Sequence, residues 1–191
     1  MLDNLDFYKS AYKKHGLSAC GLNWNSKESQ HVRFEVITSF LKDELASSSI
    51  VDAGCGFGDL YFFWLEKALH VEGYMGIDSV QNSIDICRQR LPKVTFFCKD
   101  ILKDSLPSAD WYVASGSLNI LSEFQTWLFL EKMLAYSKKG IVFNILEGDK
   151  KSEYFNYQRK EDIMLFAESK GFKFRFKDGY LKNDITVEIR K

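Results

Sequence analysis

The sequence has no excess of charge of either sign. Its 191 residues carry 26 basic and 26 acidic side chains, so the formal net charge at pH 7 is zero. A chain without a net positive field does not collect nucleic acid through counterion release. Nucleic acid is therefore not favoured as a partner, and the short basic pairs along the chain are interpreted as solvated edges of helices and loops.

Cysteine, proline and long apolar runs are also scarce. The four cysteines form no Cys-x-x-Cys pair and have no partnering histidine cluster, which argues against a zinc site or a disulfide framework, and we expect no metal. No apolar stretch approaches the roughly 18 residues of a membrane helix, and no basic-then-apolar leader opens the chain. We expect a cytoplasmic protein without a membrane partner. A chain of 191 residues is long enough for one well-buried core and short for two, so we expect a single domain, 1–191.

Against this background, residues 48–60 hold three glycines within five positions. Ile50 and Val51 are typical of a buried strand, the glycines form a turn, and the apolar run 60–69 predicts a helix. A residue without Cβ can take a positive φ and lets a ligand touch the backbone amides. The turn is a candidate nucleotide site, although glycines at such a turn also serve tight packing alone.

Acidic residues follow the next two predicted strands. Asp78 ends the run 74–77, where a neighbouring parallel strand would deliver its carboxylate to a ribose diol. Asp100 follows the third run, 94–98, and precedes Ile101. A nucleoside therefore has candidate contacts at three successive strand ends.

In combination, these residues resemble the class I S-adenosylmethionine-dependent methyltransferases. Residues 52–58 are similar to the first motif of that family, residues 76–78 to its ribose-binding acid, and residues 100–101 to its adenine-binding pair. The resemblance implies S-adenosylmethionine as cofactor. It also implies an α/β Rossmann-like three-layer sandwich, with a mostly parallel seven-stranded sheet and an antiparallel C-terminal hairpin. The implied cofactor-binding residues are Asp52, Gly54, Cys55, Gly56, Asp78, Ser79, Asp100, Ile101, Ser115 and Arg33.

The same resemblance implies roles for four of these side chains. Asp52 faces the methionine part of the cofactor, Asp78 holds the ribose hydroxyls, and Asp100 accepts from the adenine amino group. Arg33 meets the carboxylate of the methionine part, for which a guanidinium fork is chemically apt. The alternative for Arg33 is an exposed arginine on the first turn of a helix.

The N-terminal region, 1–46, is interpreted as a helical lid and a leading helix, and residues 47–191 as the cofactor-binding core. Residues 5–12 have the spacing of a short amphipathic helix, which either covers the site or shields one side of the sheet. Asn25 and Glu28 have capping-box spacing, so a second helix is expected from there to about Leu45.

The rest of the chain alternates strands and helices, which favours a mainly parallel sheet with right-handed crossovers. Ser122 and Gln125 have the spacing of a second capping box. Gly140 is expected to end a connection before a strand at 141–145. Gly171 is expected to end a helix over 159–170. Residues 172–176 and 185–189 alternate as two strands of a hairpin.

A dinucleotide-binding Rossmann domain is the rival interpretation of the turn. Its fingerprint is Gly-x-Gly-x-x-Gly, and in this chain the third glycine arrives one residue early. Asp52 also stands where that fingerprint usually has no acid. The dinucleotide reading is therefore not favoured.

No residue is selected as catalytic, because transfer from a sulfonium depends mainly on placing the two reactants. Side chains to test as base or substrate contacts are Tyr12, His15, Asn119, Tyr154 and Tyr157. The polar, aromatic segment 146–158 either selects the substrate or is a surface loop. We expect a methyltransferase whose acceptor is a small metabolite. A non-catalytic module that binds S-adenosylmethionine is the alternative, and a protein or RNA acceptor is less favoured.

Overall fold

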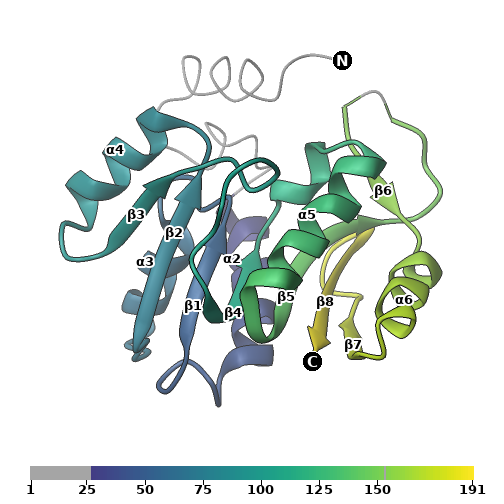
Figure 1. The fold of residues 1–191 in the computed structure, drawn as a ribbon, viewed down its shortest axis with the longest axis horizontal. Coiled ribbons are helices and arrows are strands. Elements are labelled where there is room, and N and C mark those ends of the chain that lie inside the picture. Colours follow the sequence, from purple (N-terminus) through teal and green to yellow (C-terminus); the bar gives the residue numbers. More distant parts are fainter. Residues whose placement is uncertain (1–26, 153) are drawn as a thin grey trace.

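The computed structural model describes residues 27–152 and 154–191, in which eight strands form one twisted sheet flanked by helices (Figure 1). The main path of the sheet runs in the order β3-β2-β1-β4-β5-β8-β7, and the short β6 pairs with β5 beside that path. The strands are β1 (Ser49–Ala53), β2 (Gly73–Asp78), β3 (Thr95–Cys98), β4 (Ala109–Ala114), β5 (Ser137–Glu147), β6 (Tyr157–Gln158), β7 (Lys173–Lys177) and β8 (Asp184–Arg190).

Helices cover both faces of this sheet. They are α2 (Lys27–Leu41), α3 (Asp59–Glu66), α4 (Gln81–Arg90), α5 (Glu123–Tyr136) and α6 (Lys160–Ser169), with a short 3-10 helix, η2 (Ser117–Ile120). Successive residues of β1 point to opposite faces. Ile50 packs in the cluster built from α2, α3 and α4, whereas Val51 packs in the cluster built from α5 and α6. The result is a three-layer sandwich.

The first five strands are parallel, and the C-terminal strands are not. β1 pairs in parallel with β2 and β4, β2 with β3, and β4 with β5. β8 is antiparallel to both β5 and β7. The expected fold class is confirmed, and the two-residue β6 is added to the expected seven strands. Because parallel strands end at the same edge, the segments that follow β1, β2, β3 and β4 meet there.

Local sequence patterns predicted the ends of several elements correctly. The capping box at the start of α5 is confirmed: Ser122 Oγ accepts from the Gln125 backbone N–H at 3.3 Å, and Gln125 Oε1 accepts from the Ser122 backbone N–H at 3.0 Å. Gly171, just after α6, takes the left-handed conformation with φ +70°. The expected helix over residues 5–12 and the capping residue Asn25 lie outside the described residues.

Two expected boundaries were wrong. Helix α2 ends at Leu41, and the chain then turns over residues 42–47 instead of staying helical to Leu45. β5 begins at Ser137, so Gly140 lies inside the strand. A Cβ at Gly140 would lie 2.2 Å from the carbonyl oxygen of Ile189 and 2.8 Å from the ring of Trp111. Glycine is needed there because β8 and a buried indole press against the strand, which no local pattern reveals.

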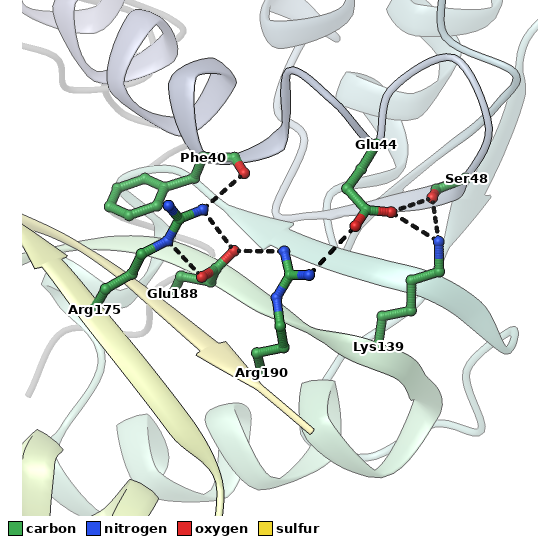
Figure 2. Close-up of polar contacts among 7 residues, drawn as sticks. All are labelled: Phe40, Glu44, Ser48, Lys139, Arg175, Glu188 and Arg190. Atoms are coloured by element: carbon green, nitrogen blue, oxygen red, sulfur yellow. Dashed lines mark hydrogen bonds and ion pairs between the residues drawn. The ribbon is translucent and has the colours of Figure 1, made fainter.

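A buried carboxylate on β8 binds the C-terminal end of α2 to the sheet (Figure 2). Glu188 is 4% exposed and accepts from Arg175 Nε at 2.6 Å and Arg175 Nη2 at 3.1 Å. Arg175 also donates to the carbonyl oxygen of Phe40 at 3.1 Å, in the last turn of α2. The guanidinium therefore links β7, β8 and α2.

The row of charges continues from Glu188 toward the loop after α2 (Figure 2). Arg190 Nη2 donates to Glu188 at 3.1 Å, and its Nη1 donates to Glu44 at 3.4 Å. Glu44 accepts from Lys139 Nζ at 2.7 Å, and this contact, with a smaller one from Ser48, holds the pKa of Glu44 below its usual range. The alternating signs fasten residues 42–48 against β5 and β8.

Within the two described ranges, none of the helices combines the length and the apolar character that a membrane crossing requires.

We expect Glu188→Gln to lower the free energy of unfolding by about 1–3 kcal/mol, because two arginines lose their charged acceptor in a buried place. Urea denaturation measures this change. The control is Glu131→Gln, which removes the exposed Glu131–Lys170 ion pair at 3.0 Å and should cost less than about 1 kcal/mol. Equal, small effects of both substitutions would show that the row of charges adds little to stability.

Candidate functional site

A cavity of about 1300 Å³ opens where the parallel strands end. Its lining comes from the segments after β1, β2, β3 and β4, from the face of α2, and from the segments after β5 and before β8. Pockets for one small molecule usually measure about 300–1,000 Å³. The cavity therefore has room for more than one ligand.

All of the residues that the sequence singled out for cofactor binding line this one cavity. They are Arg33, Asp52, Gly54, Cys55, Gly56, Asp78, Ser79, Asp100, Ile101 and Ser115. The structure thus brings together side chains that lie as far apart in the chain as Arg33 and Ser115. Which of them bind a cofactor stays a prediction.

The glycine turn is held against the end of β2 by backbone hydrogen bonds. The N–H groups of Gly54 and Cys55 both donate to the carbonyl oxygen of Ile77, at 2.8 and 3.0 Å. Gly54, Gly56 and Gly58 take φ values of +82°, +54° and +77°, which suit glycine and few other residues. Helix α3 then begins at Asp59. Sterics therefore require glycine at this turn.

Asp78 connects the turn to the start of α4. Its Oδ2 accepts from the Gly56 N–H at 3.0 Å, and its Oδ1 accepts from the Val80 N–H at 2.9 Å. Burial raises the pKa of Asp78 to about 6. A carboxylate offers about four acceptor positions, so these two bonds leave capacity for a ligand. The sequence did not reveal that Asp78 also shapes the turn.

Asp52 is buried at the end of β1, with 2% of its surface exposed. Its Oδ2 accepts from Tyr74 Oη at 2.7 Å. Burial, with a smaller contribution from the nearby charge of Asp78, raises the pKa of Asp52 to about 7. Sequence reasoning missed Tyr74 as a partner. The strand register, which pairs Tyr74 with Ile50, places the phenol and the carboxylate on the same face of the sheet.

The tips of β3 and β4 supply the next parts of the wall. Asp100 Oδ1 accepts from the Leu102 N–H at 2.9 Å, and its Oδ2 lies 3.0 Å from Lys103 Nζ. Ile101 beside it is buried. Ser115 Oγ donates to Asn144 Oδ1 at 2.8 Å. The side chain of Ser115 thus contacts β5 while the residue lines the cavity.

Helix α2 supplies a basic and an amide side chain to the cavity. The side chain of Arg33 is only 11% exposed, so the alternative of an exposed arginine is wrong. Its Nε donates to Asp184 Oδ2 at 2.6 Å, and Nη2 donates to the same oxygen. Gln30 donates to Asp59 Oδ2 at 3.3 Å, which links α2 to the start of α3. No local sequence pattern predicts either partner, because both contacts join segments that are distant in the chain.

The five side chains proposed as substrate contacts do not all lie at the cavity. Asn119 and Tyr157 line the cavity. Asn119 Oδ1 also accepts from the Leu146 N–H at 3.1 Å, so it supports the loop after β5. Tyr154 is 56% exposed and is not part of the cavity lining. Tyr12 and His15 lie outside the described residues.

Charge is distributed unevenly along the described part of the cavity. The acids Asp52, Asp78 and Asp100 come from the ends of β1, β2 and β3. Lys150 follows β5 and Lys182 precedes β8, toward the opposite side of the sheet. The same cavity is also lined by apolar side chains, among them Leu121, Phe129, Leu146 and Phe155. Lys99 and Lys103 line the cavity beside Asp100, so the end near β3 carries both signs of charge, and the part near β5 and β8 contributes the basic residues Lys150 and Lys182.

Comparison with known proteins gives three consistent findings. Residues 50–140 match the sequence model of a family described as a methyltransferase domain. The magnesium-protoporphyrin O-methyltransferase of Rhodobacter capsulatus is 32% identical over 124 residues. That match covers 62% of this chain and 54% of the relative, so the chain spans about half the length of the curated relative.

Solved structures share the whole fold. The crystal structure of magnesium protoporphyrin IX methyltransferase from Synechocystis PCC 6803, with bound S-adenosylmethionine, aligns with a TM-score of 0.72 at 14% identity, covering 100% of this chain and 99% of that one. A S-adenosylmethionine-dependent methyltransferase from Clostridium acetobutylicum aligns with a TM-score of 0.67 at 13% identity, covering 98% and 99% of the two chains. At such identities these similarities establish the fold.

The raised pKa of Asp52 predicts an unusual pH dependence of stability. Folded Asp52 has a pKa of about 7, whereas an unfolded aspartate has about 3.9. The folded state binds more protons between these values, so the contribution of this group to stability falls as the pH rises from about 4 to 7. We expect the stability of Asp52→Asn relative to wild type to increase over this interval in urea denaturation.

Asp110→Asn is a control for which the expected pH dependence of stability has the opposite sign. The backbone N–H of Ser49 donates to Asp110 at 2.9 Å and lowers the pKa of Asp110. This acid stabilises the fold above about pH 4 and loses that effect as the pH falls through its lowered pKa. Its variant should therefore lose stability relative to wild type as the pH rises toward about 4. A flat difference for Asp52→Asn would contradict the raised pKa.

Proposed function

We propose that this chain, whose residues 50–140 match a methyltransferase domain, is a class I S-adenosylmethionine-dependent methyltransferase, an enzyme that moves a methyl group from S-adenosylmethionine to a small-molecule acceptor. One observation carries the proposal. The glycine turn and the acids Asp52, Asp78 and Asp100 converge on a cavity with room for a second ligand. We further propose that the ten lining residues named above bind the cofactor.

The chemistry of the lining fits the cofactor. Asp78 has acceptor capacity beyond its two backbone bonds, as a ribose diol requires. Asp100 stands at the tip of the adjacent strand β3, suited to an adenine amino group. Asp52 places a buried carboxyl group behind the turn, where a positively charged ligand favours its ionised form.

S-adenosylmethionine supplies, when bound, a methyl group on a sulfonium that is already a good leaving group. The protein's part is to position the reactants and to exclude water. The backbone of the glycine turn and Asp78 hold one side of the cavity, and Asn119 and Tyr157 line the side toward the acceptor. A general base is required only if the acceptor carries a proton that must leave.

We propose that the acceptor is an apolar molecule with an acidic oxygen. The cavity lining combines the basic residues Lys150 and Lys182 with the apolar side chains Leu121 and Phe155. The relative from Rhodobacter capsulatus is by name an O-methyltransferase of magnesium protoporphyrin. Magnesium protoporphyrin is therefore the first acceptor to test.

We also propose a domain organisation and a location for the protein. Residues 1–191 form one methyltransferase domain, with 1–46 as lid and leading helix and 47–191 as core. The location is cytoplasmic. A non-catalytic module that binds S-adenosylmethionine remains the alternative function, with a protein or RNA acceptor less favoured because the net charge is zero.

We expect Asp78→Ala to weaken binding of S-adenosylhomocysteine by about 1–3 kcal/mol, since ligand and turn both lose an acceptor. Gly56→Val should abolish binding, because a β-branched residue does not tolerate the φ of +54°. Isothermal titration calorimetry measures both, with Asp85→Ala on the exposed side of α4 as control. Unchanged affinity in both variants would place the cofactor elsewhere, and binding of NAD alone would restore the dinucleotide interpretation.

The activity is tested by incubating the protein with methyl-labelled cofactor and magnesium protoporphyrin. Parallel reactions contain fractionated metabolites, proteins or RNA. We expect label in a small molecule, and label in RNA or protein would correct the acceptor class. Binding of S-adenosylhomocysteine without labelled product in any fraction would favour the binding module.

A further inference from the structure

A chain of side-chain hydrogen bonds starts at Ser115, which follows β4 and lines the cavity. Ser115 Oγ donates to Asn144 Oδ1 at 2.8 Å. Asn144 Nδ2 then donates to Thr186 Oγ1 at 2.5 Å and to Tyr180 Oη at 3.4 Å. Asn144 and Thr186 have no exposed surface. The side chain of a cavity residue is thus tied into the interior of the β5–β8 pair.

The same chain of hydrogen bonds ends at Arg33 on α2, which also lines the cavity. Tyr180 Oη donates to Asp184 Oδ1 at 2.6 Å. Asp184 is 2% exposed, and its Oδ2 accepts from both Nε and Nη2 of Arg33. Every bond between Ser115 and Arg33 is therefore made by side chains, and two of the cavity's walls are connected through the core.

Strand β8 has two buried carboxylates on the face that packs against α2, and only one of them binds an arginine that lines the cavity. Asp184 and Glu188 have the same strand parity and lie on the same face of the sheet. Glu188 binds Arg175 and Arg190 (Figure 2), neither of which lines the cavity. Asp184 binds Arg33, which does. Only the Asp184 contact reaches the candidate site.

We propose that Asp184 is a positioning residue that fixes the guanidinium of Arg33 where it binds the carboxylate of the cofactor's methionine part. This inference rests on the proposed function. An arginine side chain has large rotamer entropy, which an ion pair through Nε and Nη2 removes before the ligand arrives. Tyr180 fixes the carboxylate of Asp184 in turn. Pre-organisation of this kind increases affinity by lowering the ordering cost of binding.

Two ligands separate positioning from a merely structural role. S-adenosylhomocysteine contains the amino-acid carboxylate, and 5′-methylthioadenosine is the same nucleoside thioether without it. We expect Asp184→Asn to weaken S-adenosylhomocysteine about tenfold or more and to leave the affinity for 5′-methylthioadenosine unchanged. Calorimetry on the full chain measures both. Arg33→Gln should produce the same selective loss, and the double variant should lose little more than either single variant.

Glu188→Gln is the matched control, because it removes a buried charge on the same strand that also holds α2. It should lower stability without changing the ratio of the two affinities. If Asp184→Asn fails to fold, Tyr180→Phe removes one bond to Asp184 and should still weaken S-adenosylhomocysteine selectively, by a few-fold.

Three results would overturn the inference. The first is an equal loss of affinity for both ligands in Asp184→Asn, and the second is unchanged affinity for both ligands in that variant. The third is a selective loss of affinity for S-adenosylhomocysteine in Glu188→Gln that is as large as the loss in Asp184→Asn. If wild-type protein binds neither compound, the proposed function itself fails. That outcome is distinct, because it is seen before any variant is made.

Discussion

The site depends on the contact between the glycine turn after β1 and the end of β2. Two amides of the turn donate to the carbonyl oxygen of Ile77, and a third, that of Gly56, donates to Asp78. These bonds require β1 and β2 to be parallel neighbours in one register. They also require a backbone with positive φ, which only glycine adopts at little cost. The rest of the cavity is arranged around this junction.

Burial of acids at this junction has an electrostatic consequence. Asp52 and Asp78 both have raised pKa values, about 7 and about 6, because the fold removes them from water. The fold keeps two carboxyl groups that ionise less readily than an aspartate in water. Such an arrangement costs stability and is typical of a site that binds a charged ligand.

Helix α2 is held to β8 by two separate carboxylates. Glu188 and its arginines bind the C-terminal end of the helix (Figure 2), and Asp184 binds Arg33 nearer its start. The antiparallel strand β8 thus does more than complete the sheet. It sets the orientation of a helix whose residues Gln30 and Arg33 line the cavity. The C-terminal hairpin therefore helps to position residues that line the cavity.

The sequence by itself determined what depends on neighbouring residues. The capping box at Ser122, the glycine turn and the alternation in β8 are local patterns, and each produced the expected structure. The candidate lining residues were also recognised, because a short motif followed by acids at strand ends fixes which edge of a parallel sheet they share. Only the tertiary structure determined which residues contact the side chains of the site and the glycine in β5. Tyr74 meets Asp52, Asp184 meets Arg33, and Ile189 forces glycine at position 140, because each contact joins segments whose separation in the chain carries no information about their distance in space.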